Sequence, residues 1–163
     1  MIMNTRAYEM VSNPMLLGTI ELLKAENSVE HQNIFASELK NATFLAPVVI
    51  TPEPEKDENG RLRMLPDSRI SFPMLQTKAG QFFFMAYTDV HELQKWKGAE
   101  NPNAFALKLE DYAQMLAQEG PDGAENPALG MVIDPFGCNM AVFRDMIERL
   151  TGNATDAAQS SEE

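Results

Sequence analysis

The chain has 163 residues, of which 44% are hydrophobic and 23% are charged, values that are typical of a soluble globular protein with one domain. Acidic residues outnumber basic ones by 24 to 13, and the net charge of −11 disfavours binding to nucleic acid or to an anionic membrane. A single cysteine, Cys138, excludes an internal disulfide and a zinc site with several cysteines. With no signal-peptide pattern and no apolar run that could span a bilayer, the sequence predicts a cytoplasmic protein.

Two helices are predicted first, after an N-terminal extension over residues 1–12. Asn13-Pro14 is a typical helix start, because asparagine caps helices and proline suits the first turn. Ser28 can cap the second helix. Apolar spacing predicts the buried side chains, which are Leu16, Ile20 and Leu23 in the first helix and Ile34, Phe35 and Leu39 in the second.

A three-strand meander is predicted next. The apolar run Phe44–Ile50 indicates a strand, in which Pro47 favours an edge position or a bulge because proline has no N–H to donate. Ile70–Gln76 and Gln81–Thr88 flank the turn Lys78-Ala79-Gly80 and predict an antiparallel hairpin. The second of these strands is apolar on both faces, so we expect it to lie centrally in the sheet.

An acidic loop separates the first two of these strands. Residues 52–66 contain three prolines and the turn pair Asn59-Gly60, which indicates a mobile hairpin-like loop. The loop can attract a basic partner, although a run of charge is usually only a solvated loop. Its acidic residues are Glu53, Glu55, Asp57 and Glu58.

The second half alternates helices and strands. Asp89 is expected to cap a short helix with Trp96 pointing inward, and Asn139 is expected to cap the last helix. Between them the pattern predicts a strand at 104–109, a helix at 110–119 and a strand at 129–133. This order predicts one α+β domain over residues 13–150, with helices packed on a mixed, mostly antiparallel sheet of about five strands. Residues 151–163 contain no large apolar side chain and predict a disordered acidic tail.

Motifs for catalysis or for cofactor binding are missing from the sequence. His31 and His91 are 60 residues apart and neither has a metal-ligand spacing, so no metal site is predicted. A helix start directly after Cys138 could activate its thiol, but a small side chain in a tight turn is the favoured interpretation. The sequence lacks a glycine-rich phosphate loop and a nucleophile elbow, so no cofactor and no catalytic residue is assigned.

Several local motifs resemble the N-terminal domain of the SseB family, the enhanced-serine-sensitivity proteins of bacteria. They are the opening Asn-Pro-Met-Leu at 13–16, the run Phe84–Asp89 followed by Leu93 and Trp96, and the apolar strand that ends in Val132–Gly137. Asp134 stands where the family usually has asparagine. The resemblance covers about residues 13–150 and implies an α+β fold, a regulatory or binding role, and no established activity or cofactor.

Three hypotheses for function follow. The favoured one is a non-enzymatic regulatory or protein-interaction domain, and the first alternative is a small-molecule binding domain or weak enzyme with its site at the strand-to-helix turns. In the third, the protein is a homo-oligomer that pairs through an edge strand, such as Phe44–Ile50. The partner is expected to be a protein, and the chain alone is expected to be a monomer or a weak homo-oligomer. The candidate binding residues are Thr88, Asp89, Trp96, Asp134, Pro135, Phe136 and Gly137, together with the acidic loop.

Overall fold

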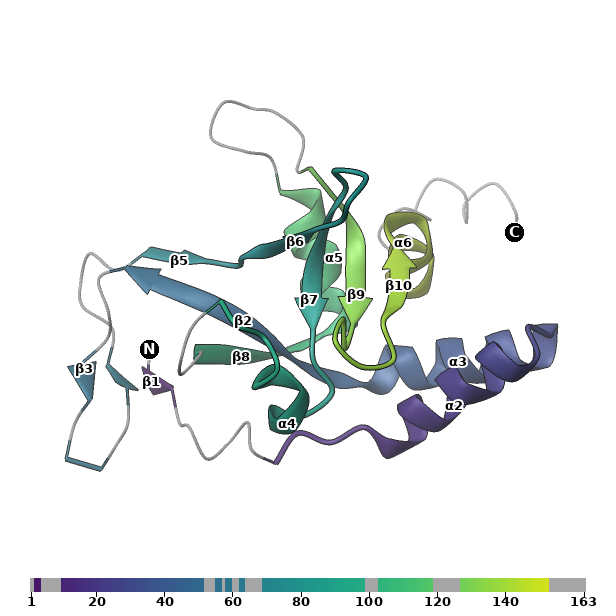
Figure 1. Cartoon of the computed structure of the whole chain (residues 1–163), viewed down its shortest axis with the longest axis horizontal. Coiled ribbons are helices and arrows are strands. Elements are labelled where there is room, and N and C mark those ends of the chain that lie inside the picture. The colour runs from purple at the N-terminus through teal and green to yellow at the C-terminus, as the bar shows by residue number, and fades with distance from the viewer. Residues whose placement is uncertain are drawn as a thin grey trace.

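Figure 1 shows the computed structural model of the whole chain, which describes residues 2–3, 10–51, 55–56, 58–59, 62–63, 69–98, 103–118 and 127–152. The predicted fold class is confirmed, since the described residues form one α+β domain. The predicted number of strands was too low, because among the described residues two linked sheets hold seven strands and a separate small sheet holds three more. None of the described helices is both long and apolar enough to cross a bilayer.

Helices α2 (Pro14–Ala25) and α3 (Val29–Asn41) form a hairpin that extends away from the sheets (Figure 1). The predicted cap at Ser28 is confirmed, since its hydroxyl oxygen accepts a hydrogen bond from the His31 N–H at 3.1 Å. Phe35 and Leu39 are buried as expected. The expectation for Ile34 was wrong: this side chain is exposed, because the helix turns it away from the face that carries Phe35 and Leu39.

Strand β2 (Thr43–Thr51) lies between β5 (Arg69–Ser71) and β8 (Asn103–Lys108) in an antiparallel sheet. The prediction of an edge strand for 44–50 was therefore wrong, but Pro47 still lies where its missing N–H is tolerated. Leu45 directs its N–H and C=O to Tyr87, and Pro47, two residues later, faces the same side. Pairing with β5 on that side begins only at Val49, so no described strand faces the Pro47 nitrogen.

The second sheet has the order β10-β9-β7-β6. Strands β6 (Met74–Gln76) and β7 (Phe82–Ala86) form the predicted antiparallel hairpin, and β7 is central, as its apolar sequence indicated. β7 also pairs in parallel with β9 (Ala128–Ile133). The predicted strand 70–76 is interrupted at Phe72-Pro73: its first half pairs with β2 and its second half with β7. This strand and the bridge between Leu45 and Tyr87 link the two sheets.

The chain from β7 to β9 passes through α4 (Val90–Leu93), β8 and α5 (Leu109–Ala117). The prediction of a last helix that begins after Asn139 was wrong. Residues Met140–Phe143 form β10, an antiparallel partner of β9, and α6 follows over Arg144–Thr151. A four-residue apolar run does not distinguish a strand from a helical turn, and pairing with β9 decides the outcome here.

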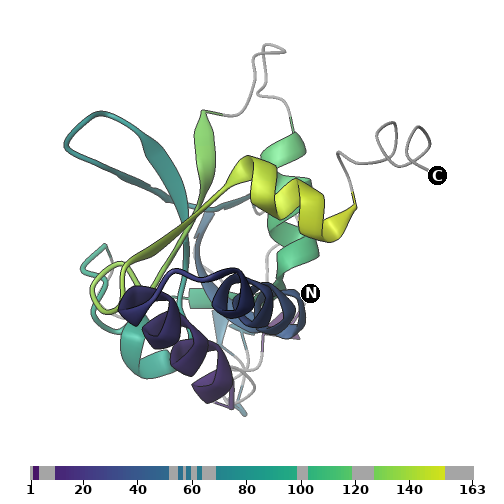
Figure 2. The ribbon, with the colours of Figure 1, turned by 90° about the vertical axis from the view of Figure 1, so that its right-hand side faces the viewer.

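The main core lies between the four-stranded sheet and the helices. Figure 2 shows α5 (green) and α6 (yellow) together on one side of this sheet. Phe44 and Tyr112 meet edge to face there at 6.2 Å between ring centroids, and the Tyr112 hydroxyl donates to the Met85 carbonyl oxygen at 2.8 Å. A second, smaller cluster lies under α4 and is formed by Leu45, Met85, Tyr87, Leu93 and Ala104.

The acidic loop contains a short antiparallel hairpin, as predicted. β3 (Glu55–Lys56) pairs with β4 (Leu62–Arg63), and β4 also pairs with β1 (Ile2–Met3) from the N-terminal extension. Glu58 lies in the turn of this hairpin and is exposed. Glu53 and Asp57 lie outside the described residues, and so do residues 153–163 of the predicted tail.

Candidate functional site

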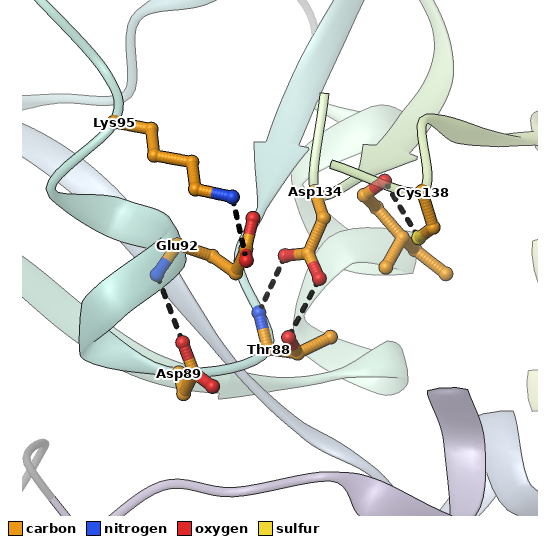
Figure 3. A network of polar contacts seen from close by, with 7 residues as sticks. Thr88, Asp89, Glu92, Lys95, Asp134 and Cys138 are labelled. Carbon is orange, nitrogen blue, oxygen red and sulfur yellow. Dashed lines mark hydrogen bonds and ion pairs between the residues drawn. The ribbon is translucent and has the colours of Figure 1, made fainter. Parts of the chain in front are cut away.

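The ends of two neighbouring strands bring Thr88 and Asp134 together. Because β7 and β9 are parallel, their C-terminal ends lie at the same edge of the sheet, with Thr88 after one and Asp134 after the other. The Asp134 carboxylate accepts the Thr88 N–H at 2.8 Å and the Thr88 hydroxyl at 2.6 Å (Figure 3). Thr88 is 0% exposed and Asp134 is 2% exposed. We call this pair the Thr88–Asp134 joint.

The backbone of Asp134 also shapes the turn that follows β9. Its N–H donates to the Ala86 carbonyl oxygen at 2.9 Å, and its own carbonyl oxygen accepts the N–H groups of Gly137 and Asn139. Asp134 has a φ of 46°, in the left-handed region that asparagine and aspartate adopt more readily than most residues. The side chain and the backbone of this residue therefore hold the same turn against β7.

Burial makes the Asp134 carboxyl a weaker acid than an exposed aspartate. Its pKa is raised to about 6, chiefly by loss of contact with water and in smaller part by the nearby carboxylates of Glu92 and Asp89. The two hydrogen bonds from Thr88 act in the opposite direction, because they favour the charged form. The group therefore changes its charge close to neutral pH, although its burial keeps it from direct contact with solvent.

Glu92 is the second carboxylate of this region (Figure 3). Asp89 caps α4 as predicted, by accepting the Glu92 N–H at 2.8 Å, and Glu92 Oε2 forms an ion pair with Lys95 at 2.9 Å. Glu92 Oε1 is buried without a hydrogen-bond partner among the described residues. A Cβ atom added at Gly137 would lie 2.7 Å from this oxygen, so the glycine leaves the space that the Glu92 carboxylate occupies.

Cys138 is positioned by the same turn, but not at a helix start. It precedes strand β10, so the structure does not provide the helix N-terminus that could have activated its thiol. The thiol donates to the Ile133 carbonyl oxygen at 3.6 Å, and the Lys24 ammonium donates to the Cys138 carbonyl oxygen. Burial, and next the charge of Asp134, raises the thiol pKa, and a thiol that holds its proton is a poor nucleophile.

Trp96, Pro135 and Phe136 take no part in the side-chain hydrogen bonds between Thr88 and Asp134. Trp96 is half-buried and packs against the second cluster, so it has a structural role in addition to any contact with a partner. Pro135 is half-buried, and the Phe136 side chain is 49% exposed.

A metal site has no support among the described residues either. The described part of the chain contains no group of three or more His, Cys, Asp or Glu side chains that could hold a metal ion. His31 hydrogen-bonds the Glu26 carbonyl oxygen through Nδ1 at 2.7 Å.

Asn13 connects the joint to α2, which the sequence did not reveal. It occupies the predicted position before the first helical residue, but its side chain makes no capping hydrogen bond. Instead, Asn13 Nδ2 donates to the carbonyl oxygens of Thr43 at 2.8 Å and Thr88 at 2.9 Å. The Asn-Pro start indicated a cap, and no local pattern could indicate two partners 30 and 75 residues away.

Replacing Asn13 with alanine is expected to lower the free energy of unfolding by about 2 kcal/mol, because two carbonyl oxygens lose their donor. Urea unfolding followed by circular dichroism measures this change. Asn41→Ala is the matched control, since the exposed Asn41 side chain donates only to the Ser37 carbonyl oxygen in its own helix. Equal losses in the two variants would contradict the assigned role of Asn13.

A second candidate site is the outward face of α2. The face toward the core buries Leu16, Thr19 and Ile20. On the opposite face all residues of an i, i+3, i+7, i+10 series are exposed and small or apolar: Met15, Gly18, Leu22 and Ala25. Met15 is 67% exposed and Leu22 is 43% exposed. A helix that is apolar on both faces but packed on only one presents an unusual exposed apolar surface.

A groove lies beside the first residues of this face, between the start of α2 and the end of α3. It has a volume of about 210 Å³, and its lining includes Ser12, Met15, Glu38 and Asn41. Figure 2 shows α2 (purple) in the foreground at the bottom of the molecule. We refer to the exposed face of α2 together with this groove as the α2 surface.

Comparison with known families agrees with this architecture. The profile of the SseB protein N-terminal domain matches residues 18–149. The chain belongs to this family. The match to the SseB N-terminal domain includes the Thr88–Asp134 joint and most of α2, while Asn13 lies before it. No curated protein and no solved structure matches the chain significantly.

Proposed function

We propose that this SseB N-terminal domain is a non-enzymatic regulatory module that binds another protein through the α2 surface. The observation that carries the proposal is the exposure of Met15 and Leu22 on a helix whose other face is already packed. Burying one such side chain against a partner is worth about 1.5–3 kcal/mol, so two of them supply much of a specific contact. The single cysteine supports a cytoplasmic setting for this interaction.

The joint supports the same proposal indirectly. Thr88 and Asp134 are buried, and their side chains are hydrogen-bonded to each other. Their polar groups therefore stabilise the fold and are not exposed for contact with a ligand. The alternative of a small-molecule site at the strand-to-helix turns consequently has weaker support than a contact at the α2 surface. The acidic loop remains a proposed additional contact for a basic partner, with Glu58 exposed.

The test is a comparison of proteins captured from native lysate by three tagged versions of the chain. The test variant is Met15→Gln/Leu22→Gln, because glutamine keeps the helix propensity and removes the apolar contact. The matched control is Val49→Gln/Leu129→Gln, which changes two other exposed apolar side chains. We expect a stoichiometric partner that the wild type and the control capture, and that the test variant captures at least about tenfold less.

Thermal unfolding of all three proteins establishes that the substitutions leave the fold intact. The proposal fails if the same proteins are captured at the same levels by all three chains. It also fails if the wild type captures no stoichiometric partner.

A further inference from the structure

The chemistry of the α2 surface indicates what kind of partner it takes. The backbone N–H and C=O groups within α2 are used by the helix itself, so a partner strand has no free edge to pair with there. Contact must come from side chains along a line from Met15 to Ala25, which measures about 15 Å at about 1.5 Å per residue. A second helix packed against α2 matches this line over about three turns.

Gly18 lies in the middle of this line and favours close packing. A Cβ atom added there would have no neighbour within 4 Å, so the position is an open notch between Met15 and Leu22. An apolar side chain of a partner helix can enter the notch while its neighbours, one turn away, contact Met15 and Leu22. The apolar face of an amphipathic helix has this spacing.

The charges around the α2 surface are acidic. Glu21 is exposed within α2, Glu26 is exposed directly after it, and Glu38 lines the groove. The two lysine side chains of the hairpin lie beside other parts of the chain. Lys24 is directed to the Cys138 carbonyl oxygen, and Lys40 lines a separate groove with Leu109 and Thr151. A partner helix with lysine or arginine beside its apolar face therefore complements this surface.

The charge of the chain also argues against two other occupants. A second copy carries the same net charge of −11 and would bring like charges together along the contact. The chain's own C-terminal residues 153–163 have the sequence N-A-T-D-A-A-Q-S-S-E-E, which contains three acids, no base and no large apolar side chain. Neither offers the basic and apolar groups that the surface fits.

We propose that the α2 surface binds a basic amphipathic helix of another protein, an inference that rests on the protein-binding function proposed above. The apolar face of that helix packs on Met15, Gly18 and Leu22. Its lysine or arginine side chains lie near Glu21 and Glu26, and one of them reaches Glu38 in the groove. Salt weakens such binding, because the flanking ion pairs are exposed.

The test measures binding of labelled synthetic peptides to the full chain by fluorescence anisotropy. The probe is a helical Leu/Lys peptide of about 14 residues, or four turns, with leucines along one face. A second peptide has glutamate in place of every lysine, and a third has the Leu/Lys composition in a scrambled order without an apolar face. We expect the Leu/Lys helix to bind at least about tenfold more tightly than either of the other peptides.

Two pairs of variants locate the contact. Met15→Gln/Leu22→Gln is expected to weaken binding of the Leu/Lys helix about tenfold, and Val49→Gln/Leu129→Gln is expected to leave it unchanged. Glu21→Gln/Glu26→Gln is expected to weaken it about fivefold. The charge-matched control Glu110→Gln/Asp145→Asn alters two exposed acids elsewhere, and we expect less than about a twofold effect.

Two results would overturn this inference. One is equal binding of the Lys and Glu peptides. The other is binding of the Leu/Lys helix that neither α2 variant weakens, because general attraction to an acidic protein would then explain it. If the native partner is lost with Met15→Gln/Leu22→Gln but the peptides give either result, only the chemistry assigned to the partner is wrong. If no native partner depends on these residues, the proposed function itself fails.

Discussion

Replacing Asp134 with asparagine is expected to stabilise the domain by about 2 kcal/mol near pH 8. The carboxyl is buried, so ionising it in the folded state is unfavourable, and its pKa is raised to about 6. Asparagine carries no charge, accepts the Thr88 N–H through its amide oxygen and can donate to the Thr88 hydroxyl. It also tolerates the positive φ at this position. The family resemblance points to the same residue here.

The size of the effect follows from linkage. A pKa of about 6 in the folded state, against about 3.9 in the unfolded chain, corresponds to about 3 kcal/mol. We expect about 2 kcal/mol, because a neutral amide accepts a weaker hydrogen bond from Thr88 than a carboxylate does. Below about pH 4 the Asp134 carboxyl is protonated in both the folded and the unfolded state, and the folded state then has the full stability that the neutral carboxyl allows. This contribution is lost as the pH rises through about 6, so the advantage of asparagine grows over that range.

Urea unfolding of the wild type and of Asp134→Asn at about pH 4 and about pH 8 measures this difference. Asp145→Asn is the control, because Asp145 is exposed in the first turn of α6 and its substitution should change stability by less than about 1 kcal/mol. If the difference in the free energy of unfolding between the wild type and Asp134→Asn is the same at both pH values, the Asp134 carboxyl does not titrate as argued.

Replacing Gly130 with alanine is expected to lower the free energy of unfolding by about 3 kcal/mol. A Cβ atom at Gly130 would lie 2.1 Å from the Val142 carbonyl oxygen and 2.8 Å from the Phe143 Cα atom. Both are backbone atoms of β10, so no side-chain rotation can relieve the overlap. The strand must move, and this displaces Phe143 from its edge-to-face contact with Phe83, where the ring centroids are 5.6 Å apart.

Thermal and urea unfolding measure the loss, and Gly18→Ala provides the opposite case. Gly18 lies in the middle of a helix with open space at its Cβ position, so alanine there should stabilise the domain by about 0.5–1 kcal/mol. A Gly130→Ala variant as stable as the wild type would contradict the close approach of β9 and β10. If the variant does not fold at all, the overlap with the β10 backbone costs more free energy than the domain can lose.

Local sequence patterns predicted the features that neighbouring residues determine, such as helix caps and runs of apolar side chains. Ser28 and Asp89 cap helices as their positions indicated, and the apolar run at Phe82 marks the central strand because both faces are covered. Residues 140–143 were misassigned, because a short apolar run becomes a strand only when β9 is available to pair with it. Pro47 indicated an edge position or a bulge, and no described strand faces its nitrogen, because β5 begins pairing two residues later.

The candidate site was predictable only in part. The sequence singled out Thr88, Asp89 and Asp134 as residues at the ends of strands, but not that Thr88 and Asp134 would bury and satisfy each other. That outcome depends on β7 and β9 being parallel neighbours. The outward face of α2 was missed for a different reason: the apolar series at Leu16 and Ile20 explained the helix, and Leu22 had no separate signal of exposure.

The Thr88–Asp134 joint also has a consequence for the order of folding. It connects residues 46 positions apart, and the segment between the two strands it ties contains α4, β8 and α5. Closing so long a segment costs chain entropy before any contact is gained. We therefore expect such contacts to form late during folding and to break early during unfolding. An interaction absent from the transition state leaves the folding rate almost unchanged and slows unfolding. We therefore expect a change at the joint to alter the rate of unfolding more than the rate of folding.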